Sequence, residues 1–207
     1  MLLDLSEFVA VDGSPLAPEA IRMMEYLKTR SAELSASAIC ERVRAAAREL
    51  EHNVAAAPSD QVRFRPIPGK WTIAEVVDHI SQTQIRAVEE LRHLLAGRRP
   101  PLPPVYEALR SGAADWASWE ILVDELHQAN QSMIEVLQAA TDTPLTPGET
   151  TARTVMVALR KLGDGTTKSQ IWFADLRWKE YALLQRLHLL DHRTQIKSLI
   201  AALSAKA

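Results

Sequence analysis

The chain of 207 residues has the length of one domain, with room for a short appended segment. Apolar residues make up 47 % of it and charged residues 24 %, which excludes a disordered chain, a collagen-like fibre and a disulfide-stapled miniprotein. The 24 basic and 26 acidic residues nearly cancel to a formal charge of −2, so we expect neither nucleic acid nor a membrane as a partner.

The proline pattern predicts a helical protein. The 11 prolines gather in four clusters, and because proline ends helices, the stretches between the clusters predict four long helices, near 31–57, 72–96, 117–140 and 176–204. A shorter helix is expected near 17–29 and another near 151–161. No run alternates as strands and hairpin turns require, so the predicted fold class is all-α.

The helix near 72–96 has the clearest predicted start. Thr72 and Glu75 form a capping box, in which each side chain accepts a hydrogen bond from the backbone N–H of the other residue. Gly97 is a plausible C-terminal stop for this helix. The connection over 141–175 is long for a helical bundle, so we expect it to cross over the bundle or to cover one end.

The cellular compartment is expected to be the cytoplasm. The first residues include Asp4 and Glu7, where a signal peptide carries positive charge, and no stretch is apolar over the length that a membrane span requires. The single cysteine, Cys40, cannot form an internal disulfide and is expected to be a small core residue.

Two histidines lie four residues apart on the apolar face of the last predicted helix. His188 and His192 fall within a stripe of mainly apolar side chains at helical spacing. Their Cβ atoms would lie roughly 5–6 Å apart, so both imidazoles can reach one metal ion, with a third ligand supplied from elsewhere. Each imidazole can instead be satisfied by a hydroxyl, a carbonyl or a water molecule, and spacing alone leaves both interpretations open.

The other four histidines are distinguished by the helix faces on which they fall. His79 lies one turn after Glu75 at the edge of an apolar stripe, where it can point into a cleft or face water. His52 and His93 have charged neighbours and are expected to be solvated, which argues against the inward Glu-x-x-His pairs of a di-iron centre. His127 has no partner at metal-ligand spacing.

Two separated motifs carry a family resemblance. The segment Trp71-Thr72-Ile73-Ala74-Glu75 is followed by His79, and the last predicted helix contains His188-x-x-x-His192-Arg193-x-Gln195-Ile196. Together with the lead-in Arg65-Pro66-Ile67-Pro68-Gly69-Lys70, they resemble the DinB/YfiT-like family of metal-dependent four-helix bundles. The resemblance covers 31–204 and implies a four-helix bundle there, with 1–30 as a partly helical N-terminal extension.

The resemblance also implies a metal site. In the family, one histidine from the second bundle helix and two from the fourth hold a divalent metal, commonly zinc or nickel, which implies His79, His188 and His192 as the ligands. Three ligands leave a fourth position for water or substrate, as in catalytic zinc sites. Gln195 is expected either to hydrogen-bond a ligand or a bound water, or to fill a gap in the core.

The function that the resemblance implies is a metal-dependent enzyme acting on a small molecule. Relatives include transferases that use a low-molecular-weight thiol, and a hydrolase is the other enzymatic option. No catalytic residue can be named, because Glu75, the nearest candidate base, is better explained as a helix cap. The alternative is a non-enzymatic stress-response or partner-binding bundle whose metal is structural or absent. An exposed helix face also leaves a homodimer open.

Overall fold

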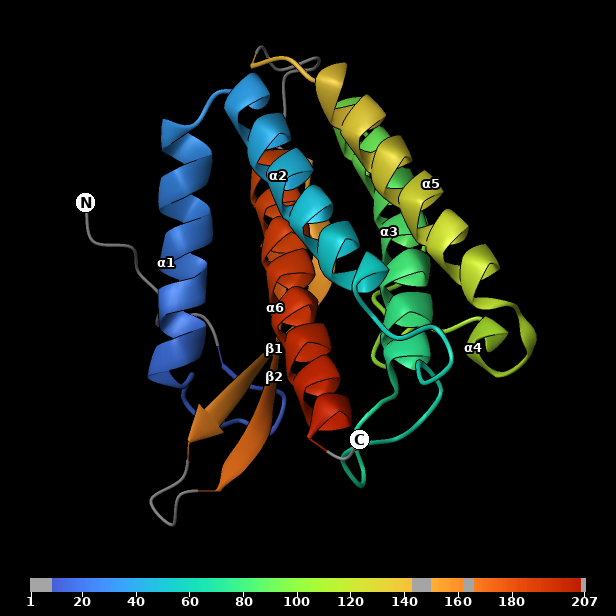
Figure 1. Ribbon diagram of the computed structural model, residues 1–207. Helices are drawn as coiled ribbons and strands as arrows, with labels where there is room; N and C mark the ends of the chain where they lie inside the picture. Colours follow the sequence, from blue (N-terminus) through green and yellow to red (C-terminus); the bar gives the residue numbers. More distant parts are fainter. Residues whose placement is uncertain (1–8, 143–149, 162–165, 206–207) are drawn as a thin grey trace.

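The computed structural model describes residues 9–142, 150–161 and 166–205 (Figure 1). The elements follow in the order α1 (Pro18–Glu33), α2 (Ala36–Ala55), α3 (Ile73–Leu95), α4 (Ala113–Trp116), α5 (Trp119–Gln138), β1 (Ala152–Lys161), β2 (Thr167–Leu176) and α6 (Trp178–Ser204). The protein is thus mostly helical, and each of the four predicted long helices is present. None of the described helices is long and apolar enough to cross a membrane.

Local hydrogen bonds explain where the helices begin and end. The predicted capping box at α3 is confirmed: Glu75 N–H donates to the Thr72 hydroxyl at 3.1 Å, and Thr72 N–H donates to the Glu75 carboxylate at 2.7 Å. Gly97 follows α3 with a φ of 67°, a left-handed conformation that favours glycine. The boundary between α1 and α2 lies at Ser35, whose hydroxyl accepts from Ala38 N–H.

Helices α2, α3, α5 and α6 lie side by side and enclose the core (Figure 1). Each contributes aliphatic side chains with no exposed surface, for example Leu50, Ile80, Leu126 and Leu189. Burial of one such side chain stabilises the fold by roughly 1.5–3 kcal/mol. Cys40 belongs to the same core, as expected from the sequence.

A β-hairpin corrects the prediction of an all-α fold. The helix expected near 151–161 is wrong, because β1 pairs with β2 in antiparallel register from Ala152 opposite Leu176 to Lys161 opposite Thr167. Alternate residues of β2 are buried and pack inward: Gln170, Trp172, Ala174 and Leu176. The alternation is hard to recognise in sequence because the inward positions of β2 include a glutamine and a small alanine, which do not stand out as apolar.

The hairpin packs against the N-terminal part of the chain. Val11 N–H donates to the Ile171 carbonyl at 2.7 Å, and Gln170 accepts from Ala17 N–H at 2.6 Å, one residue before α1. In Figure 1 the hairpin lies at the lower end of the molecule, near α1 and α6. The hairpin and the N-terminal part of the chain, both outside the four long helices, therefore support one another.

Candidate metal centre

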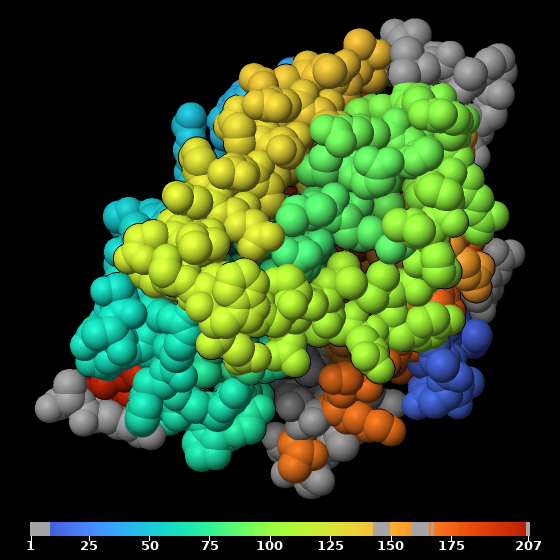
Figure 2. Space-filling model, turned by 90° about the vertical axis from the view of Figure 1, so that its right-hand side faces the viewer, coloured from blue at the N-terminus to red at the C-terminus, as the bar shows by residue number. Residues whose placement is uncertain are grey.

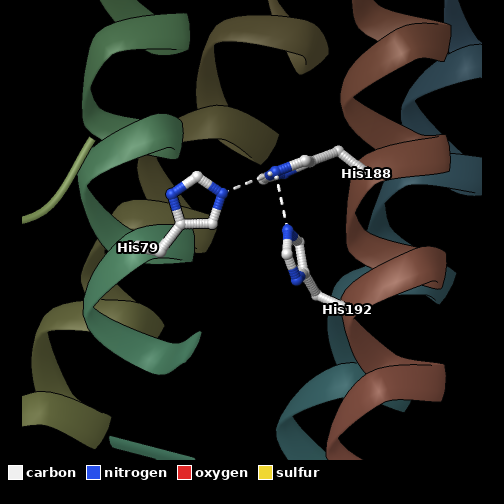
Figure 3. A group of neighbouring side chains, drawn as sticks. All are labelled: His79, His188 and His192. Atoms are coloured by element: carbon white, nitrogen blue, oxygen red, sulfur yellow. Dashed lines mark hydrogen bonds between the residues drawn. The ribbon is translucent and has the colours of Figure 1, made fainter. Parts of the chain in front are cut away.

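Three histidines from two helices direct the same ring nitrogen toward one point (Figure 3). The Nε2 atom of His188 lies 3.1 Å from Nε2 of His79 and 3.0 Å from Nε2 of His192. His79 comes from α3, whereas His188 and His192 come from successive turns of α6. One ligand atom from each residue can be chosen so that all three lie within 4.8 Å of one another.

The helix faces explain this convergence. The edge of the apolar stripe on α3 faces α6, so His79 points inward and is only 9 % exposed. His192 has the same 9 % exposure, and the four-residue spacing places His188 directly above it on α6. Of the two orientations that the sequence left open for His79, the structure shows the inward one.

The outer nitrogens of two of these rings have oxygen partners. His79 Nδ1 donates to the Leu109 carbonyl at 2.9 Å, and His192 Nδ1 donates to Gln195 Oε1 at 2.7 Å. A neutral imidazole has one N–H, so each of these rings presents a lone pair on Nε2 toward the common point. Metal-binding histidines usually have this arrangement, in which the outer hydrogen bond holds the ring and its tautomer.

The rings are held in their neutral form. Burial lowers the pKa of His79 to about 4, outweighing its bond to Leu109. Burial likewise places the pKa of His188 well below its ordinary value and lowers that of His192. At neutral pH the three imidazoles are therefore unprotonated bases, the form that binds metals.

The positions of the three Nε2 atoms are better explained by coordination of a cation than by hydrogen bonds among the rings. His188 Nε2 faces two lone pairs, and a single proton on it cannot satisfy both acceptors fully. Zinc held by three imidazoles at 2.0–2.1 Å in tetrahedral geometry would separate each pair of nitrogens by about 3.3 Å, close to the 3.0 and 3.1 Å observed for the two pairs that include His188. Imidazole is a suitable donor for both zinc and nickel.

A family model described as the DinB superfamily matches residues 41–162, more than half of the chain. The chain belongs to the DinB superfamily. No curated protein and no solved structure gives a significant match. The superfamily is associated with metal binding, and the three-histidine group is compatible with that property.

The family match includes only one of the three histidines. The matched residues include His79 on α3 but end before α6. The placement of His188 and His192 therefore rests on the fold of this chain, which brings α6 against α3. The resemblance seen in the sequence extends further than the family match, because it includes the α6 motif.

An aromatic ring and a cation flank the histidines of this DinB protein near the start of α3. The centroid of the Trp71 ring system lies 5.0 Å from that of His79, edge to face, and 6.4 Å from that of His192, nearly parallel. The Arg110 guanidinium lies over Trp71 at 5.5 Å. Arg110 belongs to the segment 97–112, which follows α3 and lies on the outer surface beside it (Figure 2).

Glu75 is engaged in holding this end of α3. Its carboxylate accepts from Thr72 N–H at 2.7 Å, from Arg65 at 3.0 and 3.1 Å, and from Arg110 at 3.2 Å. Burial raises the pKa of Glu75, but the Thr72 and Arg65 hydrogen bonds outweigh it and lower the pKa overall. A carboxylate that is ionised and already bonded is a poor general base, which agrees with the capping role expected from the sequence.

The remaining histidines do not join the site. His52 is exposed, and His127 has a side chain that is 66 % exposed and lies 3.5 Å from Glu51. His93 lies 3.4 Å from Glu89 on the same helix. Sequence reasoning missed Leu109, whose contribution is a backbone carbonyl and therefore leaves no signal in its side chain.

Proposed function

We propose that this protein is a metal-dependent enzyme that acts on a small molecule, with His79, His188 and His192 holding zinc or nickel inside a four-helix bundle of the DinB type. The observation that carries the proposal is the convergence of three neutral Nε2 atoms from α3 and α6. Among the described residues this group has three candidate ligands, whereas a closed structural zinc site has four. Three ligands leave a coordination position for a reactant.

Each group of residues at the site would have its own role. A metal at this centre would lower the pKa of a bound thiol or water and thereby supply a nucleophile at neutral pH. Leu109 and Gln195 hold the rings of His79 and His192 in the tautomer needed for binding. Trp71 and Arg110 offer an apolar surface and a positive charge to the organic part of a substrate that reaches the imidazoles.

A low-molecular-weight thiol is the co-substrate that we favour. Three neutral imidazoles leave the charge of a divalent metal uncompensated, so an anionic thiolate is a fitting fourth ligand. Sulfur is also a good ligand for zinc. In a transferase the thiolate sulfur would bond to an electrophilic carbon of the second substrate, and the leaving group would depart with the bonding electron pair. In a hydrolase, water would occupy the same position.

Cobalt substitution tests whether the position is open. Metal-free protein would be loaded with Co²⁺, whose visible spectrum reports ligand geometry, and titrated with 2-mercaptoethanol or, as the oxygen-containing control, ethylene glycol. We expect the thiol, and not the diol, to produce a sulfur-to-cobalt charge-transfer band in the near ultraviolet. The exposed-histidine variant His127→Ala should behave like the wild type, and His79→Ala should lose the response.

Each other outcome points to a different function. Cobalt binding without any response to thiol would remove the transferase proposal and leave a hydrolase, provided that the spectrum changes as a bound water loses its proton. A cobalt spectrum that responds to neither thiol nor pH would contradict an open site and support a structural metal. Failure to bind cobalt, zinc or nickel would overturn the enzyme proposal altogether.

A further inference from the structure

The Nδ1 atom of His188 stands out among the ring nitrogens of the candidate metal centre. His188 Nδ1 is buried and lacks a hydrogen bond among the described residues, whereas Nδ1 of His79 and of His192 each donates to an oxygen. Buried polar atoms without partners are rare and costly. This asymmetry singles out His188 as the ligand whose outer contact is incomplete.

The tautomer of His188 determines whether its Nδ1 atom needs a hydrogen-bond acceptor. Without a cation, a proton on Nε2 of His188 would be the favoured tautomer, because the Nε2 lone pairs of His79 and His192 both face that atom. Binding a cation through Nε2 requires a lone pair there, so the proton must move to Nδ1 of the same ring. No proton is gained or lost overall, but Nδ1 becomes a buried donor that requires an acceptor.

A suitable acceptor lies one turn away on the same helix. Gln185 precedes His188 by three residues on α6 and is 5 % exposed. Its Oε1 atom is buried and also lacks a hydrogen bond among the described residues. Residues three apart on a helix are neighbours, with Cβ atoms about 5–6 Å apart, a gap that a glutamine side chain can bridge. His192 and Gln195 already form such a pair at the same spacing, at 2.7 Å.

We propose that Gln185 is a positioning residue of the metal centre, whose Oε1 accepts the Nδ1–H of His188 when the metal binds. The inference rests on the proposed function to the extent that it requires the metal. It pairs two buried groups that each lack a partner and whose roles are complementary, a donor created by ligation and a free acceptor. All three ligand imidazoles would then have an outer oxygen partner.

Gln84 on α3 is the competing acceptor. On α3, Gln84 lies between His79, whose ring contacts His188 of α6, and Glu90, whose side chain interacts with Tyr181 of α6. Gln84 therefore lies at about the same height along α6 as Gln185. Within the part of the chain that the structure describes, the Oε1 atom of Gln84 also lacks a partner. However, its Nε2 donates to Asn130 at 3.3 Å, and Asn130 donates to Glu51 at 2.8 Å, which directs the Gln84 amide toward α5 and α2. No comparable bond orients the Gln185 amide among the described residues.

Matched variants test the assignment. Gln185→Met keeps the side-chain length and removes the acceptor, Gln185→Glu keeps an acceptor, and Gln84→Met is the control at the same level. Zinc affinity would be measured by competition with a chromophoric chelator, and thermal unfolding with and without zinc. We expect Gln185→Met to weaken zinc binding about 10–100-fold, as loss of an outer partner typically does, without lowering the melting temperature of the metal-free protein. Gln185→Glu should bind zinc at least as tightly as the wild type, and Gln84→Met should keep wild-type affinity.

Two results would overturn the inference while leaving the metal site intact. One is wild-type zinc affinity in Gln185→Met, and the other is a loss in Gln84→Met instead. If Gln185→Met does not fold, NMR of the zinc-loaded, ¹⁵N- and ¹³C-labelled wild type decides: a scalar coupling across the hydrogen bond from Nδ1–H of His188 to the side-chain carbonyl carbon of Gln185 is expected, and a coupling to Gln84 instead would contradict the proposal. A wild-type protein that binds no zinc would overturn both this inference and the proposed function.

Discussion

The buried carboxylate of Asp78 accepts two hydrogen bonds from Ser111, one from its backbone N–H at 3.1 Å and one from its hydroxyl at 2.6 Å. A third comes from Gly112 N–H, also at 3.1 Å. Leu109, which accepts the Nδ1–H of His79, belongs to the same segment. Adjacent residues of α3 therefore hold this segment at two points, and the orientation of His79 depends on both.

Replacing Asp78 should affect both the fold and the site. In Asp78→Ala the donors of Ser111 and Gly112 lose their buried acceptor, which should lower the free energy of unfolding by about 1–3 kcal/mol. The zinc affinity should fall as well, since the Leu109 carbonyl is less firmly placed. Urea unfolding of the metal-free protein and a zinc competition assay measure the two effects. Asp115→Asn, an exposed change in α4, should alter neither, and equal stability of Asp78→Ala and wild type would refute the anchoring role.

The contact between Gln195 and His192 predicts a loss that is specific to metal binding. Gln195→Met removes the acceptor of His192 Nδ1–H, so we expect zinc affinity to fall about 10–100-fold. Chelator competition measures the change. The control is Gln131→Met on α5, where an exposed glutamine contacts only Glu135 among the described residues. Equal affinities in both variants would show that Gln195 merely fills space.

The buried histidines predict that the metal-free protein loses stability in acid. Because the pKa of His79 is about 4 when folded and about 6.5 when unfolded, the unfolded chain binds a proton between these values that the folded chain excludes. Stability should thus be unaffected by this group above about pH 6.5 and should fall by up to about 3 kcal/mol as the pH drops to 4. Urea unfolding of chelator-treated protein across this range measures the slope.

Two variants distinguish the contribution of His79 to acid destabilisation from the contribution of other titrating groups. His79→Gln should flatten the slope, since it removes one of the groups that must stay neutral in the fold. His52→Gln changes an exposed histidine and should retain the wild-type slope. An unchanged slope in His79→Gln would contradict the burial of a neutral imidazole at this position.

Gln170 is expected to hold the hairpin and the N-terminal segment together. Its Oε1 accepts from Ala17 N–H at 2.6 Å, and its Nε2 donates to the Pro15 carbonyl at 2.9 Å. Gln170→Leu should cost about 1–3 kcal/mol of stability and should accelerate hydrogen exchange in α1, whereas the exposed change Ser169→Ala should do neither. Slow exchange in α1 of Gln170→Leu would show that the packing of α1 against α6 and β1 is enough to hold it.

The fold could be predicted from the sequence wherever a local signal was strong. Prolines delimit the four long helices, and the Thr72 and Glu75 pair marks the first residue of α3. The hairpin could not be recognised, because its buried alternation includes Gln170, which is satisfied by backbone groups of a distant segment. Helical periodicity and turn chemistry are local, whereas that contact is made only after folding.

The site could be predicted from the sequence only where it depends on local spacing. The spacing of His188 and His192 places both on one face of a helix, but only the packing of α6 against α3 decides that His79 meets them. The partners of the outer nitrogens differ in the same way. Gln195 is one turn from His192 and could be proposed from the sequence, whereas the Leu109 carbonyl is a backbone group from another segment.

Metal content of the purified protein tests the central claim most directly. Protein prepared without a histidine tag would be analysed by inductively coupled plasma mass spectrometry, alongside the double variant His188→Ala/His192→Ala and the exposed control His127→Ala. The account predicts close to one zinc or nickel per chain in the wild type and the control, and none in the double variant. Wild-type protein that carries no metal and takes up none when zinc and nickel are supplied would contradict it, as would a double variant that retains its metal.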